Sequence, residues 1–286
     1  MEVKDEVLRE DDEKTIYSTY PPIGVCAGIV PWNWPILLGL GKLGPALITG
    51  NTFIMKPSPY TPYCDLKLGE LAAQVFPPGV VQVLSGDDNL GPWITEHPGI
   101  DKIAFTGSIA TGKLVAASCA KTLKRYVLEL GGNDAAIVCE DVDIDKCLPK
   151  IAMMSFLNSG QICMLTKRIY IHEKIYDEFR DRMVEFMKGN IKTGAGTEEG
   201  VVVGPVQNKM QYVVQSARIE TSLTTTGLTR SKTCTLRSRG VTGRLRCLDL
   251  LATSNMATSL PRRSSTTRPR TLVSFKRSPL VPLCLC

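Results

Sequence analysis

The sequence predicts an α/β protein built on a mainly parallel β-sheet. Short apolar runs bounded by Gly, Pro or polar residues alternate along the chain with segments whose apolar residues recur at helical spacing. Strands that alternate with helices imply crossover connections, with helices covering both faces of the sheet. With 286 residues, 43% of them hydrophobic, the chain is long enough to bury a sizeable core in one or two domains.

The first part of the chain supplies most of the strands. Apolar runs predict strands at 22–30, 52–56, 80–84, 102–106 and 125–130, with helices at 39–51, 64–76 and 110–120 between them. The helix at 64–76 carries Leu68, Leu71, Ala72 and Val75 at helical spacing and stops before Pro77. We assign residues 1–130 to a first domain.

A second domain is predicted over residues 131–220. Strands are expected at 135–138 and 168–173, and helices at 143–157 and 174–187. Pro149 fits poorly inside the first of these helices, because proline removes a backbone donor. The second is amphipathic, with Tyr176, Phe179, Met183 and Phe186 on one face.

The composition changes after about residue 220. Of the 34 Lys and Arg residues, 12 lie in 221–286 with only one of the 28 acids, which leaves 22 bases and 27 acids in 1–220. The segment is rich in Ser, Thr and Arg and lacks a clean period of two or 3.6. We expect a disordered tail, or an aberrant one produced by a shifted reading frame. A basic nucleic-acid arm is the third interpretation.

The composition also narrows the class of protein. The N-terminus is charged and acidic, unlike a secretory signal, and no run is long and apolar enough to span a membrane. The ten cysteines show no C-x-x-C spacing, and only two histidines are present, so neither a disulfide framework nor a zinc site is indicated. These features predict a cytoplasmic protein, and the acidic body argues against nucleic acid as a partner.

Three side chains stand out as candidates for chemistry. Cys163 closes the polar run "NSGQIC" just after a helical pattern ends, a setting that suits a thiolate nucleophile, although a buried structural cysteine is the alternative. Glu129 ends an apolar strand and precedes two glycines, so it is either a general base or a solvated strand tip. Asn33 in "PWNWP" is either a rigid oxyanion donor or a turn residue.

Two further segments suggest a nucleotide. The run 104–113, "AFTGSIATGK", predicts a strand, a Gly-containing turn and a helix whose first N–H groups could bind phosphate. It nearly matches an ATP-type phosphate loop from Gly107 to Lys113, but Leu114 replaces the hydroxyl residue that would bind magnesium. Lys56 ends a predicted strand, where ligands of open α/β sheets collect; an ordinary surface lysine is the alternative.

Taken in order, "PWNWP", "KPS", "FTGS", "LELGG" and "NSGQIC" resemble the NAD(P)-dependent aldehyde dehydrogenase superfamily over residues 22–220. The resemblance implies that Cys163 adds to an aldehyde carbonyl as the nucleophile and passes through a thiohemiacetal and a thioester. It implies that Asn33 and the Cys163 N–H stabilise the oxyanion, and that Glu129 activates the hydrolytic water. Oxidation of a small-molecule aldehyde to a carboxylic acid is the expected reaction.

The resemblance also assigns the NAD or NADP site. Its residues are expected near the nicotinamide (Ile29, Val30, Pro31, Trp32), at the adenosine ribose (Lys56, Ser58) and at the pyrophosphate (Gly107, Ser108, Ile109, Ala110, Thr111, Gly112). Pro59 stands where many NAD-preferring members carry an acid, so the preference between the two cofactors stays open. The resemblance implies a homo-oligomer for an intact member, and we do not extend that expectation to this shortened chain.

By the same resemblance residues 1–130 are expected to form a partial NAD(P)-binding domain and residues 131–220 a partial catalytic domain, so the fold is incomplete at both ends. The family's long N-terminal portion and its later "E-x-F-G-P" motif have no counterpart in the sequence. We therefore expect a poorly soluble chain of low activity, and an inactive fragment that serves as an interaction module is the alternative function. An ATP-binding module is a third. The residues do not identify the aldehyde, and oxidation in specialised biosynthesis or in detoxification both fit.

Overall fold

The computed structural model describes residues 4–213, 233–238 and 241–249. The chain divides into two compact units, Met1–Gly132 and Asn133–Cys286, and each is described by itself. The predicted boundary lies at 130, two residues before this division.

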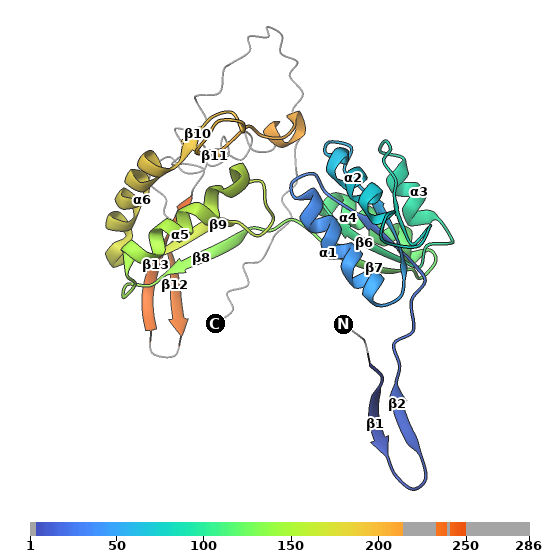
Figure 1. Cartoon of the computed structure of the whole chain (residues 1–286). Coiled ribbons are helices and arrows are strands. Elements are labelled where there is room, and N and C mark those ends of the chain that lie inside the picture. The colour runs from blue at the N-terminus through green and yellow to red at the C-terminus, as the bar shows by residue number, and fades with distance from the viewer. Residues whose placement is uncertain (1–3, 214–232, 239–240, 250–286) are drawn as a thin grey trace. The chain divides into compact units, whose positions relative to one another are not determined.

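The first unit is built on a five-stranded parallel sheet (Figure 1). Its strands are β3 (Val25–Ile29), β4 (Thr52–Lys56), β5 (Val81–Val83), β6 (Lys102–Thr106) and β7 (Arg125–Glu129). They pair in the order β5-β4-β3-β6-β7, so the chain crosses from one side of β3 to the other between β5 and β6. The predicted α/β class with a mostly parallel sheet is confirmed.

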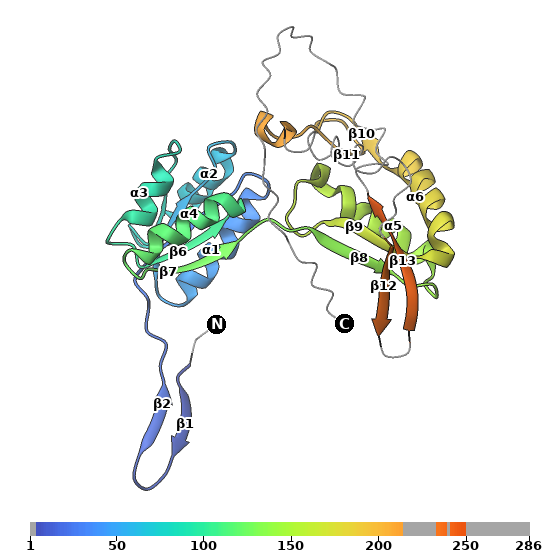
Figure 2. The same cartoon turned by 180° about the vertical axis from the view of Figure 1, so that it is seen from behind.

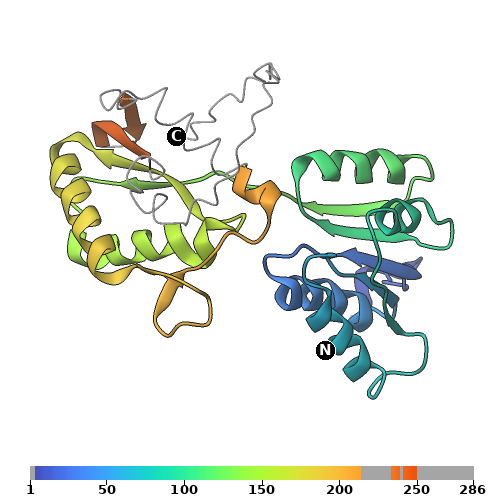
Figure 3. The same cartoon turned by 90° about the horizontal axis from the view of Figure 1, so that it is seen from above.

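Helices cover both faces of this sheet (Figure 3). On one face α1 (Pro35–Ile48) and α2 (Pro62–Ala72) pack together, and Leu43 of α1 joins Phe53 and Met55 of β4 in a buried cluster. On the other face lie α3 (Leu90–Glu96) and α4 (Ile109–Ala120), whose Ile94 and Val115 belong to a second cluster built around β6. Fully burying one such large apolar side chain stabilises the fold by roughly 1.5–3 kcal/mol.

The N-terminal segment forms a two-stranded antiparallel ribbon (Figure 2). It consists of β1 (Glu6–Glu10) and β2 (Thr15–Ser18), and most of its residues are exposed, Leu8 and Tyr17 among them. The sequence pattern gave no indication of this ribbon, because a strand pair exposed on both faces needs no alternation of apolar and polar residues.

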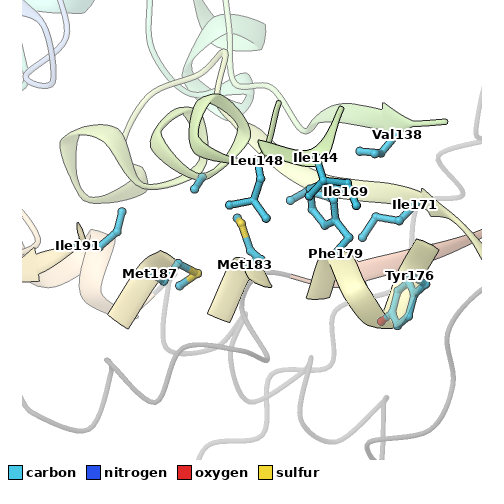
Figure 4. Packing of buried hydrophobic residues seen from close by; sticks show 11 residues of the cluster. Val138, Ile144, Leu148, Ile169, Ile171, Tyr176, Phe179, Met183, Met187 and Ile191 are labelled. Atoms are coloured by element: carbon cyan, nitrogen blue, oxygen red, sulfur yellow. The ribbon is translucent and has the colours of Figure 1, made fainter. Parts of the chain in front are cut away.

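The second unit has a mixed sheet in the order β12-β13-β9-β8. Strands β8 (Asp134–Val138) and β9 (Thr166–His172) are parallel, and α5 (Ile144–Phe156) and α6 (Tyr176–Asn190) pack with them. Figure 4 shows the core, in which Phe179 and Met183 of α6 meet Leu148 of α5 and Ile169 of β9. The turns are completed by the 3-10 helices η1 (Leu157–Gly160) and η2 (Glu173–Ile175) and by a parallel pair, β10 (Lys192–Thr193) and β11 (Val201–Val203).

Two strands lie within the segment expected to be a disordered tail. These are β12 (Thr233–Ser238) and β13 (Val241–Asp249), which pair antiparallel, and β13 also pairs antiparallel with β9. The prediction of a tail over 221–286 stays a prediction, since these two strands are the only part of that segment that the structure describes. An edge strand offers a row of backbone hydrogen-bond partners to any extended segment, whatever its side-chain pattern. Residues 221–232, 239–240 and 250–286 lie outside the described residues.

Candidate functional site

The phosphate-binding candidate is the turn that joins β6 to α4. Ser108 caps the helix, since its Oγ accepts a hydrogen bond of 3.1 Å from the backbone N–H of Thr111. Gly107 N–H donates to the carbonyl oxygen of Glu129 at 3.0 Å, which fixes the turn against the end of β7. The first N–H groups of a helix lack partners within that helix, so this turn can accept an anionic group.

Gly112 allows α4 to lie close to the sheet. A Cβ atom on this residue would come within 2.6 Å of Leu130 Cδ2. The glycine in the predicted phosphate turn thus has a packing role, and the helix N-terminus takes its position from the contact with Leu130.

Strands β3 and β4 end beside this turn in the same parallel sheet. Val30 N–H donates to the Lys56 carbonyl oxygen at 2.9 Å, which ties the two strand ends together. Ile29 and Val30 are buried, whereas Pro31, Trp32 and Asn33 are half-buried and lead into α1. The predicted cofactor residues of β3, β4 and β6 therefore share the carboxyl edge of one sheet, where ligands of open α/β folds bind.

Lys56 is buried, with 6% of its surface exposed, so the interpretation as an ordinary surface lysine is wrong. Its Nζ donates to the carbonyl oxygen of Pro57 at 3.3 Å. Burial lowers the pKa of Lys56, and the carboxylates of Asp88 and Asp87 oppose that shift. Ser58 is equally buried, and its Oγ accepts from Tyr60 N–H at 3.3 Å.

Lys42 of α1 is a functional candidate that the sequence analysis missed. Its Nζ donates to Thr106 Oγ1 at 2.6 Å, at the end of β6. Burial lowers the pKa of Lys42, and the negative charge of Glu129 opposes that shift. Thr106 and Glu129 are register partners in β6 and β7, so an ammonium, a hydroxyl and an exposed carboxylate gather at this strand end. The available signal was one charged residue in an otherwise apolar helix.

Cys163 lies in the second unit, in the loop after η1. Asn158, Ser159 and Gly160 have positive φ, so the chain turns sharply between α5 and the cysteine. The thiol residue is exposed and lies between the buried residues Ile162 and Leu165. An exposed cysteine is accessible to a substrate, and the interpretation as a buried structural cysteine is wrong.

Side-chain hydrogen bonds hold the Cys163 loop. Ser159 Oγ donates to the Gly204 carbonyl oxygen at 2.9 Å, and Gln207 N–H donates to Gln161 Oε1 at 2.9 Å. The Lys167 ammonium donates to the carbonyl oxygens of Ile162 and Cys163 at 3.1 and 2.9 Å. Lys167 therefore orients the backbone at the cysteine, a role that nothing in its local sequence indicated.

The three predicted catalytic side chains are divided between the units. Asn33 and Glu129 belong to the first, and Cys163 belongs to the second. Among the described residues there is no group of His, Cys, Asp and Glu side chains suited to a metal ion. Within the same residues, every helix is too short or too polar to cross a membrane.

Comparison with known proteins identifies the family. Residues 1–228 match the model of the aldehyde dehydrogenase family. The chain belongs to the aldehyde dehydrogenase family. It is 50% identical over 203 residues to the aldehyde dehydrogenase LUC3 of a Fusarium species, which covers 71% of this chain and 42% of that protein. The resemblance seen in the sequence motifs is confirmed.

Solved aldehyde dehydrogenase structures share the fold. The NAD complex of PnpE is 35% identical and covers 82% of this chain and 47% of its own, with a TM-score of 0.74. An NADP-dependent Escherichia coli enzyme is 32% identical and covers 85% of this chain and 50% of its own, with a TM-score of 0.75. The chain thus spans about half the length of the aldehyde dehydrogenases that it matches.

Proposed function

We propose that this aldehyde dehydrogenase chain oxidises an aldehyde to a carboxylic acid with NAD or NADP, through a covalent thioester on Cys163. The observation that carries the proposal is the exposed Cys163 on a hydrogen-bonded turn, together with the carboxyl edge of the parallel sheet in the first unit. The similarity to the NAD complex of PnpE and to an NADP-dependent enzyme supports both cofactors.

The residues at the sheet edge fit such a cofactor. Ser108 and Gly112 would hold the pyrophosphate at the N-terminus of α4, and the buried Lys56 and Ser58 would hold the adenosine ribose. Ile29, Val30, Pro31 and Trp32 would line the nicotinamide side. Ile109, Ala110 and Thr111 form the first turn of α4, and Gly107 precedes its cap. When bound, the oxidised nicotinamide accepts the hydride that leaves the substrate carbon.

Different residues of the chain would carry out the separate steps of the reaction. The Cys163 thiolate adds to the aldehyde carbon, while the Asn33 amide and the Cys163 N–H donate hydrogen bonds to the oxygen that becomes negative. After loss of hydride, the carbon is bound to sulfur as a thioester. Glu129 takes a proton from water, whose oxygen attacks that carbon, and the C–S bond breaks to release the acid and the thiolate.

The test uses the full chain, a panel of aldehydes and both cofactors. Replacing Cys163 by Ala should abolish formation of reduced nicotinamide, whereas Cys139→Ala, at another exposed cysteine of the same unit, should leave the rate unchanged. Glu129→Gln should lower turnover by about 10²–10⁴-fold, the usual contribution of a general base, and should accumulate an acyl group on Cys163 that mass spectrometry detects.

Two results would contradict the proposal. One is an active Cys163→Ala variant. The other is a Glu129→Gln variant that turns over as fast as the parent and shows no acylated cysteine. A parent chain that binds no dinucleotide at millimolar NAD and oxidises no aldehyde would favour the interaction-module alternative.

A further inference from the structure

Strands β4 and β5 bring two loops together at the ribose end of the proposed cofactor site. The strands are parallel neighbours in which Met55 pairs with Val83, and Leu84 N–H donates to the Met55 carbonyl oxygen at 2.8 Å. Because both strands end at this level, the residues that follow them leave the sheet side by side. One loop begins with Lys56, and the other runs from Leu84 to Asp88.

The two loops carry opposite charges. Lys56 is buried, and the segment from Lys56 to Tyr60 contains no carboxylate. The neighbouring loop contributes two exposed carboxylates, Asp87 and Asp88. Their charges act on the Lys56 ammonium and oppose the lowering of its pKa by burial, so they lie within electrostatic reach of it.

The position of Asp87 is fixed before α3 begins. Its Oδ1 accepts from Asn89 N–H at 2.9 Å, and its Oδ2 accepts from Asn89 Nδ2 at 3.1 Å. Leu90 N–H donates to the Asp87 carbonyl oxygen at 3.3 Å, which closes the turn at the start of α3. The carboxylates thus lie on a hydrogen-bonded turn. An Asn at position 87 could keep the bond from Asn89 N–H and the backbone bond from Leu90, and it would lose the bond from Asn89 Nδ2.

We propose that Asp87 and Asp88 select NAD over NADP by placing two negative charges beside Lys56 at the adenosine ribose. The inference rests on the proposed function, because it assigns the specificity of that same cofactor site. A 2′-phosphate brings about 1.5–2 negative charges, and it would meet two carboxylates and a single ammonium. The free ribose hydroxyls of NAD can instead donate hydrogen bonds to carboxylates, as in other dinucleotide folds.

The test measures equilibrium binding of NAD and of NADP to the full chain by titration calorimetry, without aldehyde. The parent should bind NAD about tenfold more tightly than NADP, and Asp87→Asn with Asp88→Asn should reduce that ratio by about tenfold, chiefly by improving NADP binding. Raising the salt concentration should reduce the parent's ratio, because the discrimination is electrostatic. Glu70→Gln with Glu96→Gln removes two exposed acids elsewhere in the unit and should leave the ratio within about twofold.

Each outcome decides the inference. A parent that binds NADP as tightly as NAD overturns it, and so does a double variant whose ratio does not change. If the double variant fails to fold, the single variants Asp87→Asn and Asp88→Asn decide the matter by the same ratio. If neither dinucleotide binds to the parent, the proposed function itself is wrong, which separates that failure from a failure of selectivity.

Discussion

Asp65 is the clearest target for a test of the fold, because its buried carboxylate lacks hydrogen-bond partners among the described residues. It is 0% exposed, and neither carboxylate oxygen has a hydrogen-bond partner among the described residues. The side chain lies in the first turn of α2 and faces α1, since a Cβ at Gly39 would come within 3.4 Å of Asp65 Oδ1. Burial raises the pKa of Asp65.

We expect Asp65→Ala to stabilise the chain. A buried unsatisfied polar group costs about 1–3 kcal/mol, and removing it recovers that cost. Two smaller effects oppose the gain: the lost attraction between an acid and the helix N-terminus, about 0.3–1 kcal/mol, and a small cavity of similar cost. The net gain should be about 1 kcal/mol, or an increase in the melting temperature of roughly 2 °C for a chain of this size.

The pH dependence gives the result a signature. Because the folded-state pKa lies above the unfolded value of about 4, the unfolded chain ionises first as the pH rises. The cost of ionising Asp65 in the folded chain is therefore small below about pH 4. It grows as the pH rises from there to the folded-state pKa, and it is constant above that pKa. The advantage of Asp65→Ala over the parent should accordingly be larger at pH 7 than at pH 4.

Thermal unfolding of the full chain, followed by circular dichroism at both pH values, measures this difference. Glu70→Ala is the matched control, since Glu70 is an exposed acid on the same helix, paired at 2.7 Å with Lys67. It should change stability by less than about 0.5 kcal/mol. If Asp65→Ala lowers the melting temperature, or raises it equally at both pH values, burial of the Asp65 carboxylate does not destabilise the chain.

Two more substitutions test the packing of the first unit by the same unfolding measurement. Gly112→Ala should destabilise the chain by about 1–3 kcal/mol, because its Cβ would overlap Leu130. Gly44→Ala, where nothing lies within 4 Å of the added Cβ, should stabilise α1 by about 0.5–1 kcal/mol. Equal effects of the two substitutions would contradict the close approach of α4 to Leu130. Lys124→Met should cost about 1–3 kcal/mol, because Lys124 is 7% exposed and its ammonium donates to two carbonyl oxygens at 2.9 and 2.8 Å. Lys121→Met, at an exposed ion pair, should have little effect, and a similar loss from both would refute that reasoning.

The strands at the carboxyl edge could be predicted closely from the sequence. The strands at 52–56 and 102–106 agree residue for residue with β4 and β6, because each is a short apolar run with a clear turn signal after it. By contrast, α3 was not predicted. Its seven residues include Gly91 and Pro92 and are too few to show a period, and the helix is held by packing of Ile94 against the α4 side of the sheet.

The candidate site could be predicted only in part, for a related reason. Motif positions such as Cys163 and Glu129 carry a local signal, a reactive side chain beside glycines. The lysines that support them do not. Lys42 contacts Thr106 across 64 positions, and Lys167 reaches back to the Cys163 carbonyl oxygen through the turn after η1. The first contact depends on which helix and strand lie beside each other, and the second depends on the path of the loop over four residues. The local residue pattern indicates neither.

Burial of a charged side chain does not by itself mark a functional site, as a comparison of Lys56 in β4 with Asp65 in α2 shows. Lys56 and Asp65 lie nine residues apart and are both buried, and burial shifts both pKa values towards the neutral form. Lys56 stands at a strand end with the opposite charges of Asp87 and Asp88 beside it, so its burial is compensated at an edge where a ligand can enter. Asp65 packs against α1, and among the described residues no cation opposes the rise of its pKa, so its burial costs stability. The sign and position of neighbouring charges, more than the depth of burial, distinguish a buried residue that can bind a ligand from one that only destabilises the fold.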